Sequence, residues 1–485
     1  MEENAALSEG GRVRSGAARP RRRATVCTAI GLVLCFASNL VAERACAEEM
    51  MGMNSTTTVT LGRVTQQTWR HWYPPCALLR MRPLRDGRIL CAWPTAGQET
   101  SKIGGAVYGE GRWRNLEEIS LDERCEMFQI DVSGDDVRLV TVANEQDKCA
   151  RIRWLDVTDW ASSGLKYPTE SRVLKIDFAD PRNRARHSSN SYDVMAVSAE
   201  GASGGATWIF GKYNERHKEY LLFFWGGGHV PSPPKFCAWE YVGGTLSGCR
   251  PLWEDGLFSG IFSLNPYNPP VYAIDKAGRP YVVFTKEGSG PLSGGGKEGP
   301  FLGWWEKGEW KKEKIEVLSR LVEGEKNFDE PSGLEAMNGT LALLWQRVRY
   351  EGGSGHVLFL WRDGEKWAPP LTVAEGADWC GAVEAALAVD ETRTAHIVWR
   401  PHHNSQEIYY RTVKGSSLSE VRSFESLGTV GKIMVAPETK AGLLHIMWSS
   451  RKSYDTDQWE VYAKSVPIPE PSASPSGGTD ETRRP

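Results

Sequence analysis

The sequence has little excess charge of either sign, because 58 lysines and arginines face 61 aspartates and glutamates, for a net charge of −3. That balance argues against a nucleic-acid partner, since binding to a phosphate backbone needs clustered positive charge. The sequence also has no Cys-x-x-Cys pair and no cysteine and histidine spacing typical of metal ligands. We therefore expect neither a metal site nor a cofactor. Few long helical patterns of apolar residues are present, whereas 50 glycines and 20 tryptophans indicate many turns and short aromatic strands.

Only one apolar run is long enough to be considered for a membrane, the 19 residues 24–42. Four arginines between positions 19 and 23 precede this run, and Ala45-Cys46-Ala47 after it offers a cleavage site of small residues. We interpret residues 1–47 as a signal peptide, with a signal anchor as the alternative. The protein is then expected to be secreted, periplasmic or on the cell surface, in contact with a membrane only if this segment stays uncleaved.

Seven of the ten cysteines lie after residue 47, so at least one of them has no partner within the chain. In an oxidising compartment, Cys125 with Cys149 and Cys237 with Cys249 are plausible disulfides. The alternative is that these cysteines are small apolar core residues.

A pattern of a turn followed by four or five apolar residues, ending in an aromatic or equivalent residue, recurs seven times. The segments start 49, 68, 75, 60, 54 and 49 residues apart: 89–93, 138–142, 206–210, 281–284, 341–345, 395–399 and 444–448. Each has a short strand before it and an aromatic strand after it, and a glycine turn often ending in tryptophan follows. Four antiparallel strands per repeat predict a β-propeller.

We therefore predict an all-β, seven-bladed β-propeller over residues 48–464, with six blades and one irregular insertion as the alternative. The last repeat lacks a fourth strand, and Thr56–Leu61 is an orphan strand that would close the ring by completing it. Blade three is the least regular, with strands expected at 206–210 and 220–225. Residues 314–318 are expected to be the fourth strand of blade four, and residues 465–485 a disordered tail rich in proline and serine.

The repeat resembles the sialidase-like propellers with Asp-box (BNR) repeats, over about residues 56–464. The resemblance rests on segments such as Asp86-Gly-Arg88 through Trp93 to Gly111-Arg-Trp113, and on the turn Asp363-Gly-Glu-Lys-Trp367. The Asp box of that family reads S-x-D-x-G-x-T-W, and only its glycine and tryptophan are kept here. The resemblance therefore implies the architecture and a glycan ligand more than any particular chemistry.

Arginines follow the second strand of three consecutive blades, at Arg347, Arg400 and Arg451, where the loops of one propeller face converge. Arginine forks bind carboxylates through two parallel hydrogen bonds, so these residues would suit an anionic sugar. The alternative is that they are ordinary solvated loop residues. The resemblance implies an arginine triad with Arg82, or alternatively Arg80, as its early member. It also implies Glu99 as acid/base and Tyr454 as a nucleophile activated by Glu335 or Glu384.

Two further functions stay open. His402 or His403 could be the general base of a lyase acting on a uronic-acid polysaccharide, or a surface histidine. A non-catalytic propeller could equally bind a carbohydrate or a protein. We thus expect a monomer with a glycan or glycoprotein partner. His396 and His445 lie inside second strands and are expected to be structural.

Overall fold

The computed structural model describes sixteen stretches of the chain, and every statement below concerns them. They are residues 57–65, 78–95, 101–145, 148–163, 168–184, 188–197, 206–215, 235–252, 271–286, 298–322, 327–337, 339–349, 355–376, 384–401, 405–451 and 458–470. They belong to a compact unit over Ser55–Pro485, whereas the other unit, Met1–Asn54, lies outside the described residues and with it the predicted signal segment. No helix in the described stretches is long and apolar enough to cross a membrane.

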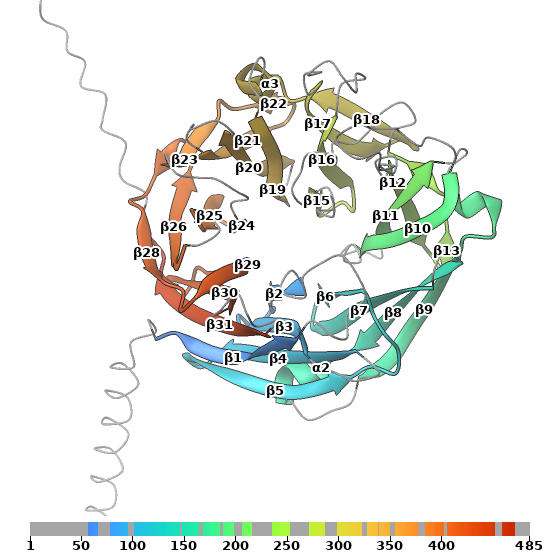
Figure 1. Ribbon diagram of the computed structural model, residues 1–485, viewed down its shortest axis with the longest axis horizontal. Coiled ribbons are helices and arrows are strands. Elements are labelled where there is room, and N and C mark those ends of the chain that lie inside the picture. The colour runs from blue at the N-terminus through green and yellow to red at the C-terminus, as the bar shows by residue number, and fades with distance from the viewer. Residues whose placement is uncertain are drawn as a thin grey trace, which may run out of the picture. The chain divides into compact units, whose positions relative to one another are not determined.

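Seven antiparallel sheets are arranged in a ring around one axis, the channel axis of a propeller, which confirms the seven-bladed propeller (Figure 1). Blade one consists of β2 (Arg80–Pro83), β3 (Ile89–Thr95), β4 (Lys102–Gly109) and β5 (Arg112–Ser120), and blade two of β6 (Met127–Ser133), β7 (Asp136–Glu145), β8 (Cys149–Asp156) and β9 (Thr169–Asp177). Blade three consists of β10 (Ser188–Val197), β11 (Thr207–Glu215), β12 (Lys235–Val242), β13 (Thr245–Leu246) and β14 (Arg250–Pro251). Blade four consists of β15 (Val271–Ile274), β16 (Pro280–Lys286), β17 (Glu298–Glu306) and β18 (Glu309–Lys314).

The last three blades follow the same order from the channel outward. Blade five consists of β19 (Asn327–Met337), β20 (Thr340–Arg349), β21 (Gly355–Asp363), β22 (Lys366–Trp367) and β23 (Leu371–Gly376). Blade six consists of β24 (Ala385–Val389), β25 (Thr394–Trp399), β26 (Glu407–Lys414), β27 (Ser417–Leu418) and β28 (Arg422–Glu425). Blade seven consists of β29 (Thr429–Glu438), β30 (Leu443–Arg451), β31 (Gln458–Pro467) and β1 (Val59–Thr65). Two short α-helices lie in the described connections, α2 (Thr158–Ser163) and α3 (Glu316–Val322).

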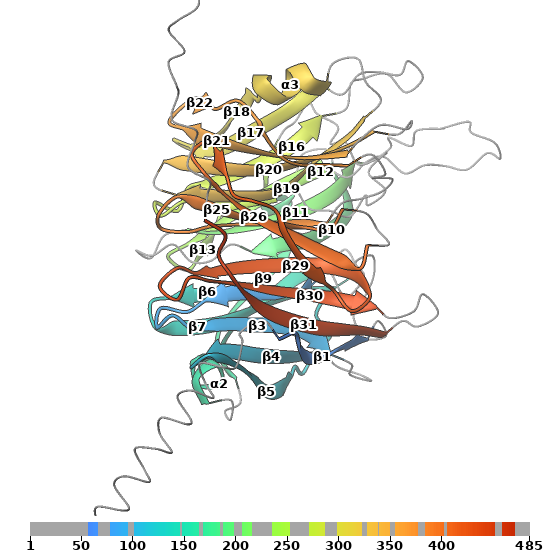
Figure 2. The ribbon, with the colours of Figure 1, turned by 90° about the vertical axis from the view of Figure 1, so that its left-hand side faces the viewer.

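The N-terminal strand closes the ring, as the sequence predicts. β1 pairs antiparallel with β31, from Val59 opposite Ala463 to Thr65 opposite Gln458 (Figure 2). The strand covers Val59–Thr65 and so starts three residues later than the predicted Thr56–Leu61. β31 continues to Pro467, so the expected domain boundary at residue 464 falls inside this strand. Pairing of the two chain ends satisfies the outer edge of blade seven, which would otherwise be exposed.

Two predicted strands do not hold the places expected for them. The third strand of blade three is β12, which pairs with β11 from Thr207 opposite Tyr241; the predicted 220–225 segment lies outside the described residues, so a strand there stays a prediction. In blade four the fourth strand is β18, and 314–318 spans its last residue and the start of α3. Ile315 and Leu318 are buried and three residues apart, so they share one side of a helical turn. The apolar residues of 315–318 also match the composition of a short strand.

Tryptophans at the strand ends are buried between blades, and some of them bond to a neighbouring backbone. The Trp208 indole donates to the carbonyl of Gly278 in blade four at 3.2 Å, and Trp160 of α2 donates to Glu117 of β5 at 2.7 Å. A Cβ on Gly105 would lie 2.3 Å from the Trp160 ring, so only glycine lets α2 pack against β4. The regular tryptophans are therefore packing residues.

The five described cysteines, Cys91, Cys125, Cys149, Cys237 and Cys249, are free thiols. The two predicted disulfides are therefore not formed. The Cys149 thiol instead donates to the Glu145 carboxylate at 3.3 Å, and burial raises the pKa of the Cys125 thiol to about 12. Four of the five are buried, in line with the alternative of small core residues, and Cys249 is half-buried.

Candidate functional site

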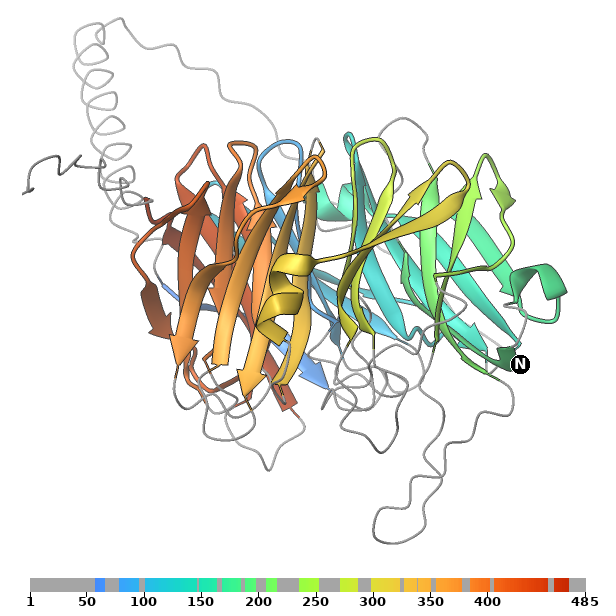
Figure 3. The same ribbon diagram turned by 90° about the horizontal axis from the view of Figure 1, so that it is seen from above.

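The two ends of the channel differ in what surrounds them. Each first-to-second and third-to-fourth strand hairpin turns at one end, which we call the hairpin face, and Figure 3 shows these short hairpins gathered along one side of the ring. Second strands end, and first and third strands begin, at the other end, which we call the loop face. Loops that converge over the channel are the usual binding surface of such a scaffold.

Blades six and seven bring an ion pair to the loop face of the channel. Glu384 directly precedes β24, the innermost strand of blade six, and its Oε1 lies 2.6 Å from Nζ of Lys432 in β29, the innermost strand of blade seven. The side chains are 24% and 32% exposed, although Oε1 of Glu384 itself is buried. Lys432 is a site residue that the sequence analysis did not identify.

A β-bulge positions Lys432. The register of β29 against β30 shifts between Val430 and Ile433, and the Lys432 backbone N–H donates to Ser449 Oγ at 2.9 Å. An extra residue in an inner strand re-aims the side chains beside it, and bulges are enriched next to binding sites. The only signal for it in the sequence is the glycine before Lys432, which is too common to predict a bulge.

Arg400 directly follows β25 and Arg451 ends β30, the second strands of the same two blades. Arg400 is 9% exposed, and its Nη1 donates to the Val430 carbonyl across the blade joint. The guanidinium carbon of Arg451 lies 5.0 Å from the centre of the Trp459 ring in β31, and Arg451 is half-buried. Arg400 thus ties blade six to blade seven, while Arg451 is stacked at the rim.

Two other predicted site residues lie near the hairpin face. Arg82 is opposite Leu90, one residue before the end of β2, and Glu335 is opposite Ala342, close to the β19–β20 hairpin. Burial raises the pKa of Glu335, and the positive charge of Arg82 opposes that shift. The structure therefore brings Arg82 near Glu335, but places neither with Glu384, Arg400 or Arg451.

The remaining predicted site residues are not described with their side chains. Glu99, His402, His403 and Tyr454 lie outside the described residues, and only the backbone of Arg347 is described, opposite Asp329 in β19. Within the described stretches, no three histidine, cysteine, aspartate or glutamate side chains are grouped as metal ligands. The described part of the site therefore consists of Glu384, Lys432, Arg400 and Arg451.

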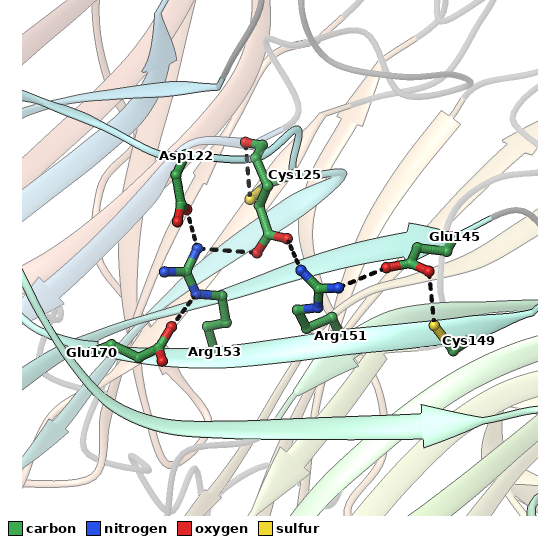
Figure 4. A network of polar contacts seen from close by, with 8 residues as sticks. Asp122, Cys125, Glu145, Cys149, Arg151, Arg153 and Glu170 are labelled. Atoms are coloured by element: carbon green, nitrogen blue, oxygen red, sulfur yellow. Dashed lines mark hydrogen bonds and ion pairs between the residues drawn. The ribbon is translucent and has the colours of Figure 1, made fainter.

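A second charged cluster lies at the loop face of blade two (Figure 4). Arg153 bonds to Glu170 at 2.6 Å, to Glu123 at 3.2 Å and also to Asp122, and this arginine lowers the pKa of Asp122. Arg151 bonds to Glu123 at 3.0 Å, and to Glu145 at 2.9 Å. The two arginines thereby hold the link from blade one against blade two, so we assign the cluster to the blade joint.

The histidines inside the second strands are structural, as expected. His396 Nε2 lies 2.9 Å from Asp390 Oδ2 in the turn before it. His445 lies 2.9 Å from Ser465 Oγ through Nδ1 and 3.0 Å from Glu438 Oε2 through Nε2. Both histidines are fully buried, so neither is available to a ligand.

No protein-family model matches the sequence, and a search of curated proteins finds no match. Solved structures similar to the chain include an ulvan lyase of polysaccharide lyase family PL25, with 13% identity over 72% of this chain and 81% of that one and a TM-score of 0.42. Another is a GH93 α-L-arabinofuranosidase of Fusarium graminearum in complex with arabinobiose, with 11% identity, 84% and 98% coverage and a TM-score of 0.39. A third is the NanB sialidase of Streptococcus pneumoniae, with 9% identity, 83% and 70% coverage and a TM-score of 0.35. At these identities the likeness is one of fold.

Proposed function

We propose that this protein is exported and binds an anionic glycan at the loop face of blades six and seven. One observation carries the proposal: the Glu384–Lys432 ion pair lies at the loop face between blades six and seven, beside the ends of the second strands that lead to Arg400 and Arg451. Lys432 is a partly exposed cation at this face, and a carboxylate or sulfate group on a glycan would complement its charge.

Arg451 and Lys432 have different parts in this proposal. The stacked guanidinium of Arg451 is held in one orientation, which suits two-point binding of a carboxylate. Lys432 offers a point charge with three donors on a partly exposed side chain. The resemblance of the repeat to sialidase-like propellers is what favours a sugar as the bearer of the anionic group.

Hydrolysis is the catalytic form of the same proposal. Glu99 would be the acid/base and Tyr454 the nucleophile, and a phenol with an ordinary pKa of about 10 needs a neighbouring base to attack at neutral pH. Of the two glutamates considered for that base, Glu384 is favoured because it lies at the loop face, whereas Glu335 lies near the hairpin face.

The test is calorimetric binding of the purified full chain to sialyllactose, trigalacturonate and a sulfated disaccharide, with lactose and galactotriose as neutral counterparts. We expect an anionic probe to bind and Arg451→Gln to weaken it about tenfold, the usual size of a lost charged hydrogen bond. The control Arg85→Gln removes the same charge from the hairpin face, where Arg85 is exposed beside Asp135, and should bind like the unchanged chain.

Turnover is measured on the same probes as fluorogenic glycosides, with Tyr454→Phe beside the unchanged chain. Turnover lost in Tyr454→Phe would establish the catalytic form, and binding without turnover would establish a binding module. Equal binding of the charged and neutral probes, or none of either, would refute an anionic-glycan site.

A further inference from the structure

We propose that Glu384 is a built-in competitor of the ligand: it occupies Lys432 in the empty site, and an acidic ligand group takes its place. The inference rests on the proposed function and adds to it a residue that sets affinity from within the chain. In this proposal Lys432 binds the anionic group, and Glu384 determines how much negative charge a ligand must carry to take its place.

The geometry of the pair favours exchange. Oε1 of Glu384 and Nζ of Lys432 are 2.6 Å apart, so the carboxylate already occupies the position that a ligand carboxylate would take. An ammonium group binds its partner as a point charge, so one carboxylate can replace another without a change of geometry. Both side chains are partly exposed although Glu384 Oε1 itself is buried, so water reaches part of the pair and weakens its attraction.

The backbone on both sides of the pair is fixed independently of it. The Glu384 carbonyl accepts from the Arg400 N–H at 2.9 Å, and the Lys432 N–H is bonded to Ser449. Arg400 also reaches the carbonyl of Val430, two residues before Lys432. Opening the ion pair therefore frees two side-chain ends while the strands that carry them stay in register.

Removing the charge of Glu384 should change the affinity in opposite directions, depending on whether Glu384 competes with the ligand or contacts it. If Glu384 only masks Lys432, Glu384→Gln should tighten the binding of trigalacturonate by about fivefold, the effect of losing one partly exposed competing charge. If Glu384 instead bonds to the ligand, the same substitution should weaken binding. Glutamine keeps the size of the side chain, so packing is conserved in the comparison.

The experiment is a double-mutant cycle on the purified full chain, with dissociation constants from calorimetry at low and high salt. Lys432→Gln should weaken binding about tenfold, Lys432→Arg should retain most of it, and Glu384→Gln should give no gain when Lys432 is already glutamine. Melting curves of each variant establish that it is folded, as expected for partly exposed side chains.

Unchanged or weaker binding in Glu384→Gln, or a gain that persists without Lys432, would overturn the inference while the proposed function stands. A wild-type chain that does not distinguish trigalacturonate from galactotriose would instead refute the proposed function. The two failures are therefore distinguishable within one set of titrations.

Discussion

Acidification should weaken the joint at which the ring closes, because the joint is built around the buried side chain of His445. Its ring lies 4.2 Å from that of Tyr108 in blade one, measured between centroids. Its two nitrogens bond to Glu438 in β29 and Ser465 in β31, so one side chain links three strands of blade seven with blade one. A charge at this position would be buried between the first and last blades.

The magnitude follows from the shift of the histidine pKa. Burial lowers the pKa of His445 from 6.5 to about 4, so the folded chain binds a proton less readily than the unfolded chain. The free energy of unfolding that depends on a neutral His445 is therefore fully present above about pH 6.5 and is lost as the pH falls toward 4. Between pH 7 and about pH 4.5 the two values give a loss of about 2.5 kcal/mol. Glu438 opposes it, because burial raises the pKa of this carboxyl and its protonation favours the fold in acid.

The assay is urea unfolding at pH 7 and about pH 4.5, followed by tryptophan fluorescence, for the unchanged chain, His445→Gln and Ser465→Ala. The difference in unfolding free energy between the unchanged chain and His445→Gln separates the contribution of His445 from those of Glu438 and the other carboxylates. We expect this difference to be about 2.5 kcal/mol smaller at about pH 4.5 than at pH 7. Ser465→Ala removes a hydrogen bond without removing a titrating group, so it should cost about 1 kcal/mol at both pH values. An identical pH dependence in all three proteins would refute the reasoning.

Three further predictions concern the same fold. Deleting residues 57–65 exposes the edge of β31 and should lower the melting temperature by about 10 °C and cause association, visible by calorimetry and size-exclusion chromatography. Gly428→Ala should cost about 2 kcal/mol in urea unfolding, because φ is +148° there and a Cβ would lie 2.7 Å from Ser450 Oγ and 2.8 Å from the Arg451 carbonyl. Burial raises the pKa of Asp390, but hydrogen bonds lower it further, to about 2; Asp390→Asn should therefore cost about 2 kcal/mol at pH 7 and progressively less as the pH falls from about 4 to 2 in the same assay.

The architecture could be predicted from the sequence because each blade repeats one local pattern. The apolar second strand is buried whatever its neighbours, and a tryptophan at its end fills the joint, as Trp345, Trp399 and Trp448 do. Ring closure could also be predicted, since a blade short of one strand and an orphan strand at the other end of the chain require each other. These inferences use only periodicity and the need to pair every strand edge.

The two differences in strand assignment have a common cause: a short apolar run does not specify its partner. Residues 220–225 and β12 both read as aromatic third strands after β11, and pairing with Thr207–Tyr213 decides between them. Ile315 and Leu318 suit the inner side of a helix turn as well as an edge strand, and a helical bond from Ser319 to Ile315 forms instead. Local pattern is ambiguous at this length.

The site was harder to predict, because a blade joint and a binding site use the same residue type. Arg411 donates to Val373 of blade five, and Arg362 binds Glu313 of blade four through two hydrogen bonds, at 2.8 and 3.1 Å. Arg400 belongs with these joint arginines by its bond to Val430, although its position in the repeat equals that of Arg451. Equal positions in a repeat therefore do not imply equal roles.

Lys432 shows the opposite limit. Nothing about its place in the repeat distinguishes it from other inner-strand residues, and it reaches Glu384 because a bulge shifts the register of β29. An irregularity in one blade is invisible to an analysis that looks for what the blades share. In a propeller with degenerate Asp boxes, departures from the repeat at the loop face are therefore the better guide to the ligand site, and Lys432 is the residue on which a binding experiment should first be made.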